Sequence, residues 1–190
     1  MFKNIFDLLI RLILQPAKAW DTLSDKQETN NDLFFKSYLY PLFGLVALLS
    51  FVGVFFSSKS FDIQLALKNS IRLIIAVFIG FYLASFLLSE VMKRIFDHSG
   101  EIKLCQRFVG YSSSLIYVLS MILSLFPEEF FFLYIFLFYT IYIIWEGSVR
   151  YMYIKEKEQV KFSAFASMII LVCPYLINTI MYMLMPGLRV

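Results

Sequence analysis

Two pairs of opposite charge are the best candidates for chemistry in this chain. Glu90 is followed four residues later by Arg94, and Glu146 is followed at the same spacing by Arg150. A spacing of four places both members on one helix face, where they stabilise each other as an ion pair. Two readings stay open: a structural pair at each position, or one polar cluster at the membrane border that acts on a lipid.

Other signatures of catalysis or ligand binding are missing from the sequence. Phosphate-binding glycine loops, a GxSxG nucleophile elbow and an HExxH zinc motif do not occur. One histidine and two cysteines are too few for a structural zinc site, which needs about four ligands. The basic residues are too dispersed for a nucleic-acid binder. We therefore expect no enzyme, with no catalytic, cofactor-binding or metal-binding residues, and no nucleic-acid partner.

Five hydrophobic blocks determine the fold class. Apolar residues make up 60% of the chain, whereas soluble domains have about 45–50%. A bilayer core of about 30 Å is crossed by about 20 apolar residues in a helix. The sequence therefore predicts an all-α integral membrane protein, in which an N-terminal segment (1–36) precedes a five-helix transmembrane domain (37–190). The expected spans are residues 37–58, 73–92, 108–127, 130–149 and 162–188.

The N-terminal segment has the pattern of a helix that lies on a membrane surface. Lys3, Asp7 and Arg11 are spaced four apart and share one face, and apolar residues fill the remainder. Pro16 is expected to end this helix, and Trp20 is expected at headgroup depth. A cleaved signal peptide is the rival interpretation, but charges interrupt the apolar region that such a peptide needs.

Small and polar residues recur on one face of several spans. Membrane helices pack through such faces, so we expect close helix packing at Ala76, Gly80, Ala84, Gly110 and Ser113. Polar faces of the third to fifth spans could instead form a path for a solute, as in a small transporter or channel subunit. Asn178 is the candidate polar residue at mid-span for such a path.

The distribution of positive charge predicts the orientation of the chain. The N-terminal segment and the second and fourth connections hold 13 of the 17 Lys and Arg residues. Basic residues remain cytoplasmic. We therefore expect a cytoplasmic-membrane (inner-membrane) protein with its N-terminus in the cytoplasm and its C-terminus on the opposite side.

Three short motifs resemble the Yip family of Ypt/Rab-GTPase-interacting proteins, in its bacterial form. The first joins a proline to a following aromatic residue, the second opens the third span and closes at its end, and the third lies near the end of the fourth span. The matching residues are Pro16 and Trp20, then Gly110, Tyr111 and Pro127, then Tyr142 and Gly147.

The resemblance implies five membrane helices with a cytoplasmic N-terminus, and it implies no established activity for bacterial members. Eukaryotic members act in vesicle traffic and bind prenylated Rab GTPases. This sequence lacks their long N-terminal cytoplasmic domain and their Asp-Leu-Tyr-Gly-Pro motif, so Rab binding is not expected. The leading hypothesis is a non-enzymatic interaction or membrane-organising module. Its expected partners are the lipid bilayer and a membrane protein or a second copy.

Overall fold

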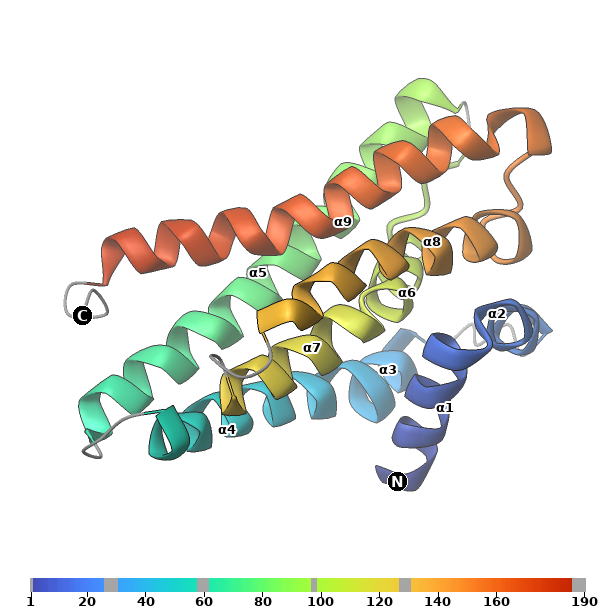
Figure 1. The fold of residues 1–190 in the computed structure, drawn as a ribbon. Coiled ribbons are helices and arrows are strands. Elements are labelled where there is room, and N and C mark those ends of the chain that lie inside the picture. The colour runs from blue at the N-terminus through green and yellow to red at the C-terminus, as the bar shows by residue number, and fades with distance from the viewer. Residues whose placement is uncertain (1, 26–30, 58–61, 97–98, 127–130, 186–190) are drawn as a thin grey trace.

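The structure is a bundle of helices, shown in Figure 1, and is a computed structural model. It describes residues 2–25, 31–57, 62–96, 99–126 and 131–185, and no strand occurs in these ranges. The all-α fold class is therefore confirmed. The helices are α1 (Phe2–Leu14), α2 (Pro16–Asp25), α3 (Asn31–Phe34), the π-helical turn η1 (Phe35–Leu39), α4 (Tyr40–Ser57), α5 (Ile63–Ile95), α6 (Ile102–Ser112), α7 (Ser114–Leu125), the 3-10 helix η2 (Phe131–Phe138), α8 (Tyr139–Arg150) and α9 (Glu156–Leu184).

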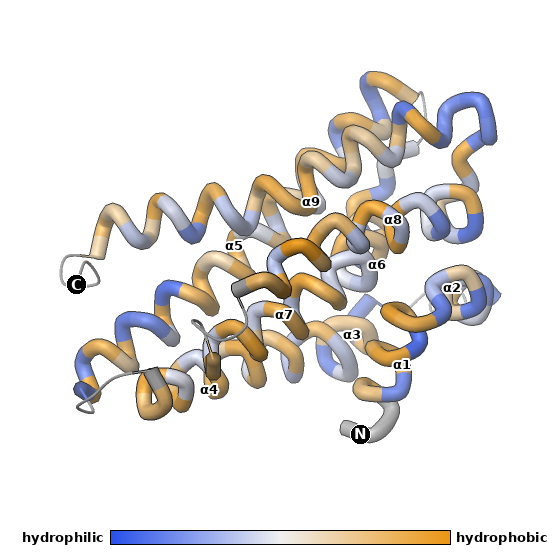
Figure 2. Tube along the Cα trace, viewed as in Figure 1, coloured by the Kyte–Doolittle hydropathy of each residue, from blue (hydrophilic) through white to orange (hydrophobic). Residues whose placement is uncertain are grey.

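Four of the described helical segments are long and apolar enough to cross a membrane. They are Asn31–Phe56, Ile63–Ile95, Phe132–Arg150 and Glu156–Leu184. The bent pair α6 and α7 makes a fifth if it counts as one span. Figure 2 shows hydrophobic residues along the middle of the bundle and hydrophilic ones gathered toward its ends. The chain is a helical integral membrane protein.

The third expected span is divided in two. A continuous helix was expected over residues 108–127, but α6 and α7 meet at Ser113 with a bend of 44°. The Ser114 hydroxyl donates to the carbonyl oxygen of Tyr111 and also contacts the Tyr38 hydroxyl at 2.5 Å. A serine side chain that bonds to the preceding turn competes with the backbone ladder and bends a helix.

Helix α1 is held against the bundle by one of its two apolar faces. The face that packs on the protein core consists of Ile5, Leu9 and Leu12. The Tyr139 hydroxyl adds a hydrogen bond to the carbonyl oxygen of Ile13 at 2.9 Å. The second apolar row, which we call the exposed row, consists of Phe6, Ile10 and Leu14. The helix is therefore amphipathic as expected, but part of its apolar surface is covered by protein.

Helices α5 and α9 pack closely along the bundle. The expected ridge of Ala76, Gly80 and Ala84 is buried on α5. A β-carbon placed at Gly80 would lie 2.7 Å from the Cα of Pro174 on α9. Only a glycine permits this approach, because the nearest neighbour is backbone and cannot turn aside.

Polar connections gather at one end of the bundle. Helix α2, the C-terminal end of α5 and the connection from α8 to α9 all lie at that end, which is on the right in Figure 1. The start of α5 and the end of α9 lie at the opposite end. Residues far apart in the chain therefore meet near α2, and that is where the candidate site is formed.

Candidate functional site

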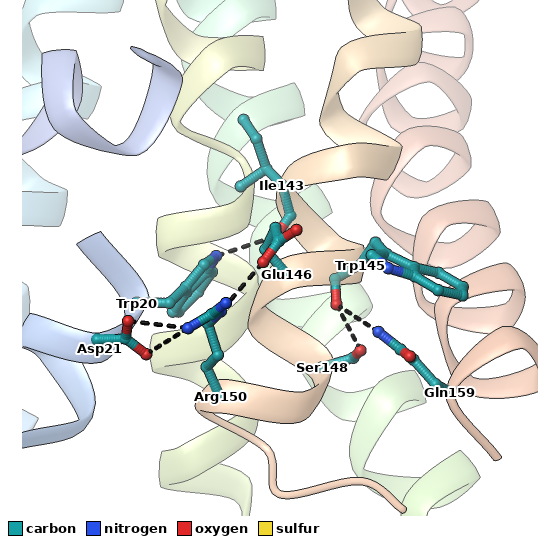
Figure 3. Close-up of polar contacts among 8 residues, drawn as sticks. All are labelled: Trp20, Asp21, Ile143, Trp145, Glu146, Ser148, Arg150 and Gln159. Carbon is teal, nitrogen blue, oxygen red and sulfur yellow. Dashed lines mark hydrogen bonds and ion pairs between the residues drawn. The ribbon is translucent and has the colours of Figure 1, made fainter. Parts of the chain in front are cut away.

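The indole of Trp20 on α2 is completely buried in the bundle. Its Nε1 donates a hydrogen bond to the backbone oxygen of Ile143 on α8 at 2.9 Å (Figure 3). The ring stacks on Phe108 with centroids 5.4 Å apart and lies 5.2 Å from the ring of Tyr151. Tyr111 meets it edge-on at 6.2 Å. Aromatic neighbours and a backbone acceptor satisfy the indole inside the protein, and its expected headgroup depth stays a prediction.

Gly147 makes room for this indole. A β-carbon at Gly147 would lie 2.5 Å from Trp20 Cε2 and 2.9 Å from Phe108 Cε2. Both rings are fully buried and have little freedom to shift. We call Trp20, Phe108, Tyr111, Gly147 and Tyr151 the tryptophan cage. The cage fixes the N-terminal helices to α6 and α8.

Arg150 forms a second link beside the cage. Its Nη1 donates to both carboxylate oxygens of Asp21, at 2.9 and 2.8 Å, and its Nε donates to Glu146 at 3.0 Å (Figure 3). Asp21 is half-exposed and Glu146 is more covered. The expected pair of Glu146 and Arg150 thus forms, and an aspartate 129 positions away joins it. Arg150 therefore ties α2 to the end of α8.

The other expected pair is separate from this link. Glu90 accepts from Arg94 Nε at 3.1 Å and from Lys93 at 3.5 Å. The Arg94 side chain is 79% exposed. Within the described ranges, no ion pair joins Glu90 or Arg94 to Glu146 or Arg150. The structure therefore divides the proposed four-residue cluster into two ion-pair groups.

A polar cavity of about 470 Å³ lies between the C-terminal end of α8 and the start of α9. Trp145, Glu146, Arg150, Glu156 and Gln159 line it. Gln159 donates to the backbone oxygen of Trp145 at 3.2 Å, and the Ser148 hydroxyl donates to the same oxygen at 2.7 Å. Figure 3 shows the Trp145 indole directed toward α9 while Glu146 points toward Arg150. The carboxylates suit a small polar or cationic group.

The remaining expected packing residues lie next to the cage. A β-carbon at Gly110 would lie 2.5 Å from the ring of Phe34 and 3.4 Å from the ring of Phe81. Ser113 is buried at the bend between α6 and α7. Gly110 therefore makes space for aromatic rings, whereas Gly80 makes space for a neighbouring helix backbone.

Asn178 lies in a different part of the bundle. Its side-chain oxygen accepts from Arg72 Nη1 on α5 at 2.8 Å, and Arg72 Nη2 donates to Asn69 at 3.3 Å. Asn178 is six residues from the end of α9, so it lies toward the end of the bundle opposite α2. The residue that suggested a solute path is thus engaged in a contact between α5 and α9.

Comparison with known proteins places these features in a family. The family model for the Yip1 domain matches residues 10–179. The chain belongs to the Yip1 family. No curated protein and no solved structure matches it. In this Yip1-family chain the matched region includes every element from the end of α1 to most of α9, and so includes the whole tryptophan cage.

Only some residues of the three motifs that suggested the family lie close together in the structure. Trp20, Tyr111 and Gly147, one from each motif, meet in the tryptophan cage. Pro16 is buried as the first residue of α2, where a proline costs no hydrogen bond. Tyr142 is 45% exposed and contacts the ring of Tyr139, which is not part of the tryptophan cage. Pro127 lies outside the described residues.

Sequence reasoning missed Asp21, Phe108 and Tyr151 as parts of this site. Asp21 directly follows Trp20, which is the one local signal that could have linked it to the cage. Phe108 was only the first residue of the expected third span, and Tyr151 followed the expected fourth span. Their roles depend on the packing of α2 against α6 and α8. The spacing of residues along a single sequence does not predict this packing.

Replacing Arg150 by glutamine is expected to lower the free energy of unfolding by about 1 kcal/mol or less, because its partners are partly exposed to solvent. A double-mutant cycle with Asp21→Asn should give a positive coupling energy that weakens at high salt. Chemical unfolding in detergent micelles measures both. Purely additive effects of the two substitutions would mean that this ion pair does not help to hold α2.

Proposed function

We propose that this membrane protein is a non-enzymatic interaction or membrane-organising module that binds through its N-terminal helices. The observation that carries the proposal is the exposed row of α1, formed by Phe6, Ile10 and Leu14. It lies on a helix whose opposite face is packed on the bundle. A surface that is held rigidly before binding loses less entropy when a partner docks.

The tryptophan cage and the Arg150 link support this proposal because they hold α2, and α1 with it, at one orientation. Leu14 ends α1 and Pro16 begins α2, so only Gln15 separates the two helices. A helix with three apolar side chains on one side suits either a lipid surface or the apolar face of another membrane helix. We favour a membrane-protein partner or a second copy, in addition to the lipid that surrounds the bundle.

The same proposal includes the orientation of the chain in the membrane and its cellular location. Positive charge concentrates at the end of the bundle that holds α2, which supports a cytoplasmic N-terminus and a C-terminus on the opposite side of the cytoplasmic membrane. Residues 1–36 act as the cytoplasmic segment and residues 37–190 as the transmembrane domain. Rab GTPase binding, nucleic-acid binding and a cofactor are not part of the proposal.

Catalysis and transport are the less favoured alternatives. The Glu90 and Glu146 carboxylates each contact an arginine of their own helix, which supports a structural role for both pairs. Asn178 is engaged by Arg72, so a transporter that uses it would first have to break this contact. Specific solute transport by the purified protein in liposomes would overturn the proposed module in favour of the transporter.

Replacing Ile10 by serine is expected to weaken partner binding by about tenfold or more if the exposed row docks a partner. The measurement is a native pull-down from membranes in mild detergent, with mass spectrometry of the proteins that co-purify in stoichiometric amounts. Val160→Ser is the matched control, because Val160 is 67% exposed at the start of α9. Equal recovery of the partner with both variants would contradict docking on α1.

A further inference from the structure

A cavity between the N-terminal helices and the bundle has the composition of a ligand site. Its volume is about 460 Å³, and residues of α1, α2, α3, η1 and α6 enclose it. Ile5, Leu8 and Phe34 supply apolar walls, while Ser37 and Tyr38 contribute hydroxyl groups. Small-molecule and lipid sites typically combine an apolar wall with a few well-placed polar groups in a volume of this order.

The charged groups that line this cavity are mainly cationic. Arg11 on α1 and Arg107 on α6 both line it, and Asp7 is the one carboxylate among its described lining residues. Asp7 and Arg11 are exposed, and Arg107 is half-buried. Within the ranges that the structure describes, Arg11 forms no ion pair with an acidic side chain. Its planar guanidinium is therefore available to a ligand oxygen.

The position of the cavity suits a lipid headgroup. Ser37 and Tyr38 belong to the π-helical turn within Asn31–Phe56, the first helix that is apolar enough to cross a membrane. The cavity thus lies beside the N-terminal part of this helix. Exposed apolar residues, including Leu33 at its wall and Ile10 nearby on α1, would meet lipid at this depth.

We propose that this cavity binds the phosphate of an anionic phospholipid. The guanidinium group of Arg11 donates to the phosphate oxygens, for which arginine has a matching bidentate geometry, and Arg107 lines the same cavity. The apolar wall of Ile5, Leu8 and Phe34 contacts the glycerol and the first part of an acyl chain. A bound lipid would join α1 to α6 beside the tryptophan cage, whose Tyr111 and Tyr151 also line the cavity. This assignment goes beyond the interaction module and does not depend on it.

Native mass spectrometry of the full chain in detergent micelles tests the assignment. The probes are phosphatidylglycerol, phosphatidylcholine and inorganic phosphate, each added separately and then phosphate in competition with phosphatidylglycerol. We expect preferential retention of phosphatidylglycerol, and an affinity about tenfold lower in Arg11→Gln because a charge-assisted contact is lost. Arg94→Gln is the matched control, since Arg94 is exposed near the same end of the bundle and does not line the cavity.

The conservative variant Arg11→Lys keeps the positive charge but lacks the planar guanidinium group. We therefore expect its affinity for phosphatidylglycerol to lie between those of the wild type and Arg11→Gln. Because Arg11 is exposed, these variants should fold, and the helical content measured by circular dichroism checks this. Equal affinity of the wild type for both lipids, or equal losses in Arg11→Gln and Arg94→Gln, would overturn the proposal. Displacement of the lipid by millimolar inorganic phosphate would also overturn it, and would reassign the cavity to free phosphate.

Discussion

Trp20→Ala is expected to release α1 and α2 from the bundle and to lower the free energy of unfolding by about 3–5 kcal/mol. The indole is fully buried, so its removal leaves a large void between α2, α6 and α8. It also leaves the backbone oxygen of Ile143 without the hydrogen bond from Trp20. Hydrogen exchange should show faster amide exchange throughout α2, and chemical unfolding in micelles should show the loss of stability.

Trp145→Ala is the matched control for this substitution, because it removes the chain's other tryptophan. The Trp145 side chain is 36% exposed and lies toward α9, away from α2. We expect a smaller loss of stability and unchanged exchange in α2. If both variants left α2 equally protected, the tryptophan cage would not be what holds the N-terminal helices to the bundle.

The fold class could be predicted from the sequence because the bilayer imposes a simple length rule. Blocks of about 20 apolar residues have few structural alternatives. The limits of individual helices were harder to predict. Helix α5 begins at Ile63, ten residues before the expected block, because the Asp62 carboxylate caps it by accepting from the backbone N–H of Gln64 at 2.8 Å. That capping signal is present in the sequence, but Lys68 and Arg72 made the segment resemble a loop.

The site was predictable only where its parts are neighbours in the chain. Glu146 and Arg150 are four residues apart, and their ion pair follows from helix geometry. Trp20 and Gly147 are distant, and the interpretation of Trp20 as an interfacial anchor followed a rule about lone tryptophans near a membrane. That rule does not predict the tertiary packing, which offers the indole three aromatic rings and a backbone acceptor.

Gly80→Leu is expected to force α5 and α9 apart and to destabilise the bundle by about 3 kcal/mol or more, at the upper end of overpacking effects. Even the first carbon of the new side chain would lie 2.7 Å from the Cα of Pro174. That neighbour belongs to the helix backbone, so it cannot move without shifting α9. Spin labels on α5 and α9 should report a larger separation, and unfolding in mixed micelles should begin at a lower denaturant concentration.

Gly44→Leu provides the matched control, since Gly44 also lies in a membrane helix but a β-carbon there has no neighbour within 4 Å. Gly44 is exposed, so leucine at this position would point into lipid and should leave the bundle unchanged. The comparison separates the effect of a larger side chain from the effect of a close helix crossing. Equal stability of the two variants would mean that α9 adapts to α5 by sliding, and that contact between Gly80 and Pro174 does not fix how the two longest helices pack.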